Sequence, residues 1–233
     1  TAVEVSSIGV QWAPGPNPAG VEFRVQASTA ADFSGILAAS AWGTPLAAVL
    51  SGLSVNTSYY LRTQGKNALG VEGSPLVLGA IFTLSSAPVA STITAVQSDG
   101  FALQWSTGSL PPWTRYEAQA STSADFSPVS ASSVTTSSTT LFTGLPSAAT
   151  FYARVRSING NGVPSVFDAV VSTRTGADFT LPGVSTGGYA VPSGTPNVVL
   201  AAWVAPGNDG AIGDLAAGSR FYVQWSSQPP AGV

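Results

Sequence analysis

The chain has 233 residues, of which 8% are charged and 44% are hydrophobic, and its formal net charge is −3. Ordinary soluble proteins carry about 25% charged residues. So small a charge gives no electrostatic reason to expect nucleic acid or an anionic membrane surface as a partner. No stretch approaches the roughly 20 apolar residues of a membrane-spanning helix, so we expect no membrane insertion.

Histidine, cysteine and methionine are absent from the sequence. Without histidine, the chain has no imidazole base, no Ser-His pair and no histidine metal site. Without cysteine, it has neither a disulfide framework nor thiolate ligands. The acidic residues are scattered, and no acid, base and nucleophile converge in the sequence. We therefore predict that the protein is not an enzyme and binds no cofactor.

A period-two pattern of apolar residues opens the chain, because Ile8, Val10 and Trp12 alternate with small or polar residues. This pattern is typical of a half-buried strand. Proline-rich residues 14–18 cannot continue a ladder and are expected to form a turn. In chain order, the strands expected next are 22–27, 36–41, 46–50, 59–64 and 76–83.

The same order of elements then returns. Gly52-Leu53 is repeated as Gly144-Leu145, and the turn sequence from Asn67 to Gly70 is repeated from Asn159 to Gly162. A repeat of this kind fixes the architecture before any local argument does. The expected strands of the second copy are 101–105, 116–120, 135–142, 151–155 and 166–173.

A third copy begins late in the chain, where Val199, Ala201 and Trp203 repeat the alternation of the first strand. Nothing shows a sustained helical period, so we predict an all-β chain. The domains expected are 1–84, whose first strand is largely missing, 85–175, and a partial copy at 176–233. We expect either that the polypeptide continues beyond these residues or that a neighbouring chain supplies strands to the partial copy.

These repeated residues resemble the fibronectin type III family. Its marks are a tryptophan on the second strand, an aromatic residue on the third, and a Leu-x-x-x-Thr-x-Tyr segment followed by Asn-x-x-Gly. The resemblance implies tandem immunoglobulin-like sandwiches of two antiparallel sheets, two near-complete and one partial, stable without disulfides. The structural core residues it implies are Trp12, Phe23, Leu53, Tyr59, Trp105, Tyr116, Leu145, Phe151, Trp203 and Phe221.

In such a domain Tyr59 would be the corner tyrosine, whose hydroxyl bonds nearby backbone. The second copy has Phe151 at this position, which lacks a hydroxyl. Loss of one hydrogen bond costs about 1 kcal/mol, so we expect the second copy to have the softer corner.

Few polar clusters suggest a site. Asn208, Asp209 and Asp214 bring oxygen atoms close together, but they lack the acidic ladder of a calcium loop, and an Asn/Gly turn is the alternative. Asp32 and Asp125 each precede a phenylalanine in a turn and are expected to bond the backbone. Among the charged strand residues, the pairs Glu22 with Arg24 and Arg115 with Glu117 are expected to be solvated surface charge, and Asn56-Thr57-Ser58 is formally a glycosylation sequon.

Trp42, Trp113 and Trp225 lie outside the core-tryptophan position. They could stack on sugar rings, including cell-surface glycans, or pack against a neighbouring subunit. The alternative is that they cover loops over the core, since tryptophans are seldom fully exposed.

Outward strand positions are mostly serine, threonine, alanine and glutamine, which are easily desolvated, and such faces suit contact between copies of the chain. We therefore expect an extracellular structural or adhesive protein of a bacterial cell surface that assembles with itself into a filament, sheath or layer. One alternative is a non-catalytic spacer or carbohydrate-contacting module of a large secreted enzyme. Another is a receptor-like binding module that uses the Trp113 loop.

Overall fold

The computed structural model describes residues 2–177, 184–205 and 219–223. All regular structure in these ranges is β-strand, and the strands pair antiparallel, which confirms the all-β prediction. The chain divides into two compact units, residues 1–177 and 178–233. The first unit contains two β-sandwiches.

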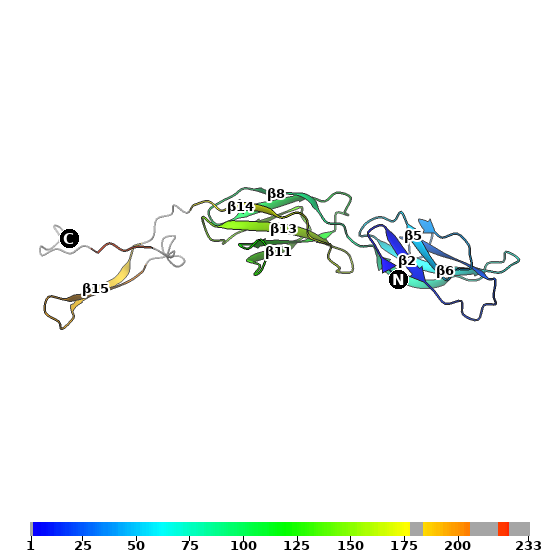
Figure 1. The fold of residues 1–233 in the computed structure, drawn as a ribbon, viewed down its shortest axis with the longest axis horizontal. Coiled ribbons are helices and arrows are strands. Elements are labelled where there is room, and N and C mark those ends of the chain that lie inside the picture. Colours follow the sequence, from blue (N-terminus) through cyan, green and yellow to red (C-terminus); the bar gives the residue numbers. More distant parts are fainter. Residues whose placement is uncertain (1, 178–183, 206–218, 224–233) are drawn as a thin grey trace. The chain divides into compact units, whose positions relative to one another are not determined.

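The first sandwich consists of a three-stranded and a four-stranded sheet (Figure 1). The three-stranded sheet has the order β1-β2-β5, and the four-stranded sheet has the order β4-β3-β6-β7. Its strands are β1 (Ala2–Val3), β2 (Ser7–Gln11), β3 (Glu22–Ser28), β4 (Ala38–Ala39), β5 (Ala47–Ser51), β6 (Ser58–Lys66) and β7 (Leu76–Phe82).

The second sandwich repeats this arrangement with sheets β12-β9-β8 and β11-β10-β13-β14. Its strands are β8 (Val89–Thr94), β9 (Phe101–Ser106), β10 (Arg115–Ser121), β11 (Ala131–Thr135), β12 (Thr139–Phe142), β13 (Thr150–Ile158) and β14 (Val171–Arg174). The predicted seven-stranded sandwich of two antiparallel sheets is confirmed.

Two strand predictions were wrong in the second sandwich. Residues 135–142 do not form one strand, because the chain bends at residues 136–138 and passes from the four-stranded sheet (β11) to the three-stranded one (β12). The change of sheet cannot be seen in the sequence, because the residues on both sides of the bend are polar or β-branched. The strand expected from residue 166 begins only at Val171. The Val155 N–H of β13 donates at 2.8 Å to the Asp168 side chain and so does not bond a backbone carbonyl of a neighbouring strand at this point.

Alternating residues of the long central strands fill each core. In β13, Phe151, Ala153 and Val155 are fully buried, and in β6 the buried residues are Tyr59, Leu61 and Thr63. The predicted core residues of the two sandwiches that are less than 10% exposed are Phe23, Leu53, Tyr59, Trp105, Tyr116, Leu145 and Phe151. Trp12 is half-buried and packs against the core of the first sandwich.

The tryptophan of each copy packs on the aromatic residue of the next strand in the same way. The ring centroids of Trp12 and Phe23 are 6.3 Å apart at 57°, and those of Trp105 and Tyr116 are 5.4 Å apart at 56°. In the second unit, Trp203 and Phe221 lie 5.4 Å apart at 59°. Similar tilts in three copies indicate one local design.

Among its described residues, the second unit contains a hairpin, in which β15 (Thr186–Pro192) pairs with β16 (Val199–Val204). Its aromatic residues are more exposed than those of the sandwiches, with Trp203 at 37% and Phe221 at 45%. A two-stranded hairpin is at best marginally stable by itself. In the described part of this unit, the tryptophan pair is thus present without the covering sheet that the sandwiches have.

The corner between β5 and β6, residues 52–57, holds the predicted tyrosine bond. The Ser54 N–H donates to the Tyr59 hydroxyl at 2.9 Å. The second sandwich has Pro146 at the position of Ser54 and Phe151 at that of Tyr59. Proline has no N–H, so donor and acceptor are lost together and no buried group is left unpaired. Because both residues are replaced together, the reason for which we expected a softer corner in the second sandwich no longer applies.

A pair of variants tests this account of the corner. Tyr59→Phe leaves the Ser54 N–H without its acceptor and should lower the free energy of unfolding by about 1–2 kcal/mol. Phe151→Tyr should give no gain, because Pro146 offers no N–H and the new hydroxyl would be buried. Urea unfolding followed by tryptophan fluorescence measures both. A stabilising Phe151→Tyr change would contradict the account.

Candidate interaction surfaces

A buried polar residue joins the two sandwiches. Asn56 is 0% exposed, with a left-handed backbone conformation (φ 46°) in the corner of the first sandwich. Its Nδ2 donates to Thr114 Oγ1 at 2.9 Å, and its Oδ1 accepts from the Gly160 N–H at 2.9 Å. Thr114 and Gly160 belong to the second sandwich. The amide of Asn56 thus bonds two elements that are far apart in the sequence, and it is inaccessible as a glycosylation acceptor in this fold.

One further hydrogen bond crosses between the sandwiches, and another joins the second sandwich to the linker between β7 and β8. Asn159 is 4% exposed, and its Nδ2 donates to the Thr83 carbonyl oxygen at 3.1 Å. The Ser157 hydroxyl donates to the carbonyl oxygen of Ser86 at 2.6 Å. Buried polar groups are costly unless paired, so these bonds define one relative placement of the groups they join.

Apolar contacts surround these bonds. The ring of Phe82 meets that of Trp113 edge-on, with centroids 5.8 Å apart at 75°. Val55 packs against the core of the second sandwich. A Cβ atom on Gly160 would overlap the Phe82 ring, so the close approach at this point requires glycine. We call the set Val55, Asn56, Phe82, Thr83, Ser86, Trp113, Thr114, Ser157, Asn159 and Gly160 the junction.

Charged residues gather on the outer face of the four-stranded sheets. In the first sandwich, the Arg24 guanidinium lies 4.4 Å from the centre of the Trp42 ring and 3.0 Å from a Glu72 carboxylate oxygen. Lys66 lies 4.8 Å from the same ring and 2.7 Å from Glu22. The expectation that outward positions are mostly uncharged does not hold for this face, since the three ion pairs found among the described residues all involve these sheets.

Glu22 and Arg24 lie on the same face of β3, as expected, but each forms its ion pair with a residue of another segment. Residues two apart on a strand share a face but lie farther apart than residues directly across from each other on paired strands. Glu22 therefore pairs with Lys66 across the sheet, and in the second sandwich Glu117 pairs with Arg156 at 2.7 Å.

A three-residue cluster recurs on both four-stranded sheets. An arginine of the long strand bonds a glutamine of the neighbouring strand and lies over a phenylalanine of the Asp-Phe turn. Arg62 and Arg154 lie 4.4 Å and 3.8 Å from the centres of their rings. The members are Gln26, Arg62 and Phe33 in the first sandwich, and Gln119, Arg154 and Phe126 in the second.

The Asp-Phe turns hold these phenylalanines in place. The Asp32 carboxylate accepts from the Ser34 N–H, and the Asp125 carboxylate accepts from the Ser127 N–H, both at 2.9 Å. These bonds confirm the predicted turns. Hydrogen bonds from Ser34 lower the pKa of Asp32, and those from Ser123 and Ser127 lower the pKa of Asp125.

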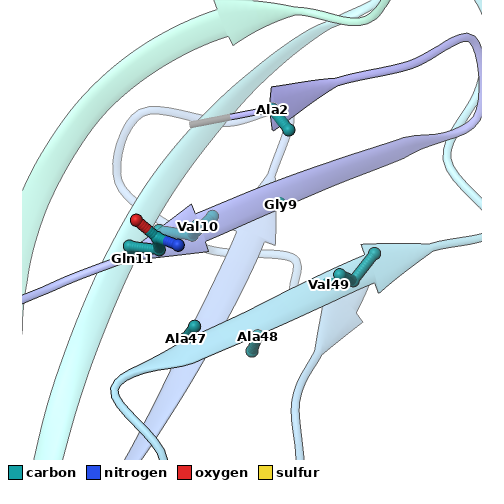
Figure 2. A pocket seen from close by; sticks show the side chains of 7 residues that line it. All are labelled: Ala2, Gly9, Val10, Gln11, Ala47, Ala48 and Val49. Carbon is teal, nitrogen blue, oxygen red and sulfur yellow. The ribbon is translucent and has the colours of Figure 1, made fainter.

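The outer face of the β1-β2-β5 sheet carries a shallow pocket of about 660 Å³ with no charged residue in its wall (Figure 2). Gln11 supplies the polar side chain of this wall, and Val49 is 67% exposed. The lining residues are Ala2, Gly9, Val10, Gln11, Ala47, Ala48 and Val49. Small uncharged residues make this face easy to desolvate, but they offer no group for catalysis.

The predicted contact tryptophans have different surroundings. The ring of Trp42 has two cations of its own sandwich against it, and Trp113 is 49% exposed with its ring against Phe82. Trp225 and the calcium candidates Asn208, Asp209 and Asp214 lie outside the described residues.

Within the described ranges, no three acidic residues gather as a metal site would require. The same ranges contain no helix capable of crossing a membrane.

Sequence reasoning missed the junction. In the sequence, Asn56 belongs to a formal sequon and Asn159 to a turn motif. One available signal was that asparagine and glycine tolerate left-handed backbone at a corner. No pattern in one repeat, however, shows which group of the next repeat it meets.

Comparisons with solved structures return fibronectin type III domains of low sequence identity. No family model and no curated protein matches the chain. A two-domain fibronectin type III segment from chicken tenascin is 10% identical, covers 75% of this chain and 95% of that chain, and has a TM-score of 0.49. Chicken CNTN1 FN1–FN3 domains are 12% identical, with coverage of 75% and 64% and a TM-score of 0.37. A fibronectin type III domain from human KIAA0970 protein is 16% identical, with coverage of 40% and 74% and a TM-score of 0.36.

A carboxylate near β14 gives a pH-dependent prediction. Asp168 accepts hydrogen bonds from Val155 N–H and the Ser91 hydroxyl, and burial raises its pKa above the ordinary 3.8. The folded chain then holds this proton more tightly than the unfolded chain. The contribution of Asp168 to stability is therefore fully present below pH 3.8 and is lost as the pH rises through the raised pKa.

Asp168→Asn keeps an acceptor for Val155 and removes the ionisation. As the pH rises from about 3 to about 7, the free energy of unfolding of this variant should increase relative to that of the unmodified chain. The reason is that only the unmodified chain has a group at position 168 that ionises over this interval. Urea unfolding at both pH values measures the difference, and effects of other carboxylates cancel in it. A relative loss of stability with rising pH would contradict this role.

Proposed function

We propose that this chain, with its two tandem fibronectin type III-like sandwiches, is a structural repeat region of an extracellular protein. Its task would be to hold successive sandwiches at a fixed spacing. The burial of Asn56 between the sandwiches, with both amide atoms bonded, is the observation that carries this proposal. Sandwiches of this architecture are common in cell-surface proteins.

The chemistry of the junction favours a fixed joint over a flexible linker. Domains in one chain move relative to each other by default unless their interface restrains them. An apolar patch restrains position without specifying orientation, whereas hydrogen bonds from Asn56, Asn159 and Ser157 require particular distances and angles. Loss of any partner would leave a buried polar group unpaired, which costs about 1–3 kcal/mol.

Assembly with copies of itself is the second candidate function, and the uncharged pocket on the β1-β2-β5 face supports it. Charges that would resist desolvation lie on the four-stranded sheets, whereas the wall of this pocket offers small, apolar and amide groups. A filament, sheath or layer could use such a face. Both candidate functions are non-catalytic.

Asparagine variants test the fixed joint. Asn56→Ala leaves Thr114 and the Gly160 N–H without their partners and should lower the free energy of unfolding by about 1–3 kcal/mol. It should also raise amide hydrogen exchange at Gly160, which belongs to the other sandwich. Hydrogen exchange of the full chain, followed peptide by peptide, measures this effect.

Asn159→Ala and Asn67→Ala form a matched control pair. Each removes a side chain that accepts from two backbone N–H groups of its own turn. Only Asn159 also donates across the junction. Asn159→Ala should therefore raise exchange around Thr83, whereas Asn67→Ala should leave the junction unchanged. Equal effects of the two variants at Thr83 would count against a fixed joint.

A further inference from the structure

The junction places an asparagine directly before a glycine. Asn159 supplies a side chain that donates to the Thr83 carbonyl oxygen and accepts from two backbone N–H groups of its own turn. Gly160 is required because a Cβ atom there would overlap the Phe82 ring. An asparagine before a glycine loses its side-chain amide more readily than one before any other residue, since glycine does not hinder the approach of its own backbone nitrogen to the asparagine side chain. The fit of the junction thus creates a chemically labile pair.

Loss of this amide is a ring closure within the chain. The backbone nitrogen of Gly160 attacks Cγ of Asn159, and the Nδ2 group leaves as ammonia with the proton that the attacking nitrogen gives up. Water then opens the resulting succinimide at either carbonyl, which leaves aspartate or isoaspartate at position 159. The net reaction consumes water and releases ammonia, so it needs no oxidant, metal or further reactant.

The first sandwich holds the groups that this reaction uses. The Gly160 N–H, which carries the attacking nitrogen, donates to Asn56 Oδ1 at 2.9 Å. The leaving group, Nδ2 of Asn159, donates to the Thr83 carbonyl oxygen at 3.1 Å. Ring closure must break the first of these bonds, because the nitrogen has to lose its proton and turn toward Cγ. Gly160 itself is exposed, so the restraint on the reaction is the hydrogen bond and not a lack of water.

The turn at residues 159–163 favours the attack once Gly160 is released. Oδ1 of Asn159 accepts from the Asn161 N–H at 3.1 Å and from the Val163 N–H at 2.8 Å. Two donors on one carbonyl oxygen stabilise the negative charge that develops on that oxygen when a nucleophile adds to the carbon. The bonds within the turn therefore do not protect Asn159, and protection has to come from the first sandwich.

The first sandwich contains the same turn outside the junction. Asn67 Oδ1 accepts from the Leu69 and Val71 N–H groups at 3.0 Å and 2.9 Å, and both turns contain a glycine with φ 81°. Asn67 is exposed, and the N–H of the next residue, Ala68, has no hydrogen bond among the described residues. At this turn the Cβ atom of Ala68 slows the attack, whereas at the other turn the junction does.

We propose that Asn159-Gly160 is a deamidation site and that Asn56 protects it by holding the Gly160 N–H. The amide is then lost only while the junction is open. The product cannot restore the joint, because an ionised carboxylate has no N–H to donate to the Thr83 carbonyl oxygen. This inference goes beyond the proposed function, since it concerns the covalent chain and gives the joint an irreversible route of failure.

The first test uses the full chain with Ala68→Gly, which gives the exposed turn the same Asn-Gly pair. During incubation at neutral pH, Asn67 of this variant should deamidate at least about tenfold faster than Asn159 of the same molecules, because only Asn159 has to wait for the junction to open. Mass spectrometry of peptides, with fragmentation to locate the change, measures both rates. In guanidinium chloride, where the junction is absent, the difference should disappear. Equal rates in the folded chain, or a difference that persists in the unfolded chain, would overturn the proposal.

The second test removes the protecting residue. Asn56→Ala should speed deamidation at Asn159 by roughly 5- to 150-fold, the effect of one lost partner of a buried polar group. Asn161-Gly162 is a reference within the same turn, because the Gly162 N–H bonds the Asn159 carbonyl oxygen and not the first sandwich. Deamidation at Asn161 should keep its rate. Equal acceleration at both asparagines, or none at Asn159, would contradict protection by Asn56.

A third variant, Asn159→Asp, carries one product of the reaction from the start. It should raise amide hydrogen exchange around Thr83 at least as much as Asn159→Ala does, and unchanged exchange there would refute the claim that deamidation opens the joint. These results are separable from those on the fixed joint. Altered exchange at the junction in Asn56→Ala, together with equal deamidation of Asn67 and Asn159 in folded Ala68→Gly, would leave the proposed function standing and overturn only the protected site.

Discussion

The buried side-chain amide of Asn56 fixes the orientation of the two sandwiches relative to each other. It has no contact with solvent, and each of its polar atoms meets a group of the second sandwich at 2.9 Å. A carboxamide in such a site tolerates little displacement, because any shift leaves a donor or acceptor unpaired in a medium without water. The glycine at position 160 and the Phe82 ring complete the fit, since the ring occupies the space that a side chain would need.

The outer faces of the two sheets of a sandwich differ in charge. The four-stranded sheets carry the arginines, their glutamine partners and the aromatic rings on which they lie, so charge there is already satisfied within the sandwich. On the first sandwich, the three-stranded sheet offers uncharged small residues instead. Contacts with other molecules should therefore use the sheet edges, turns and uncharged face before the charged one, because desolvating paired charges is costly.

Local pattern and repetition predicted most of the architecture but few of the contacts. Period-two alternation located the long strands, and the repeat aligned Trp12 with Trp105, whose rings meet equivalent partners. Alternation could not detect that residues 135–142 change sheets, since both sheets accept the same polar, β-branched residues. Nor could composition show where the charges gather, or that Asn56 meets Thr114, because these depend on tertiary placement rather than on neighbours in sequence.

The central claim is that the junction holds the two sandwiches in one orientation, and residual dipolar couplings of the full chain in a weakly aligning medium test it most directly. If the joint is fixed, couplings from β1–β7 and from β8–β14 fit a single alignment tensor of one magnitude, and Asn56→Ala separates them. Distinct tensors of unequal magnitude for the two sandwiches in the unmodified chain would contradict the account.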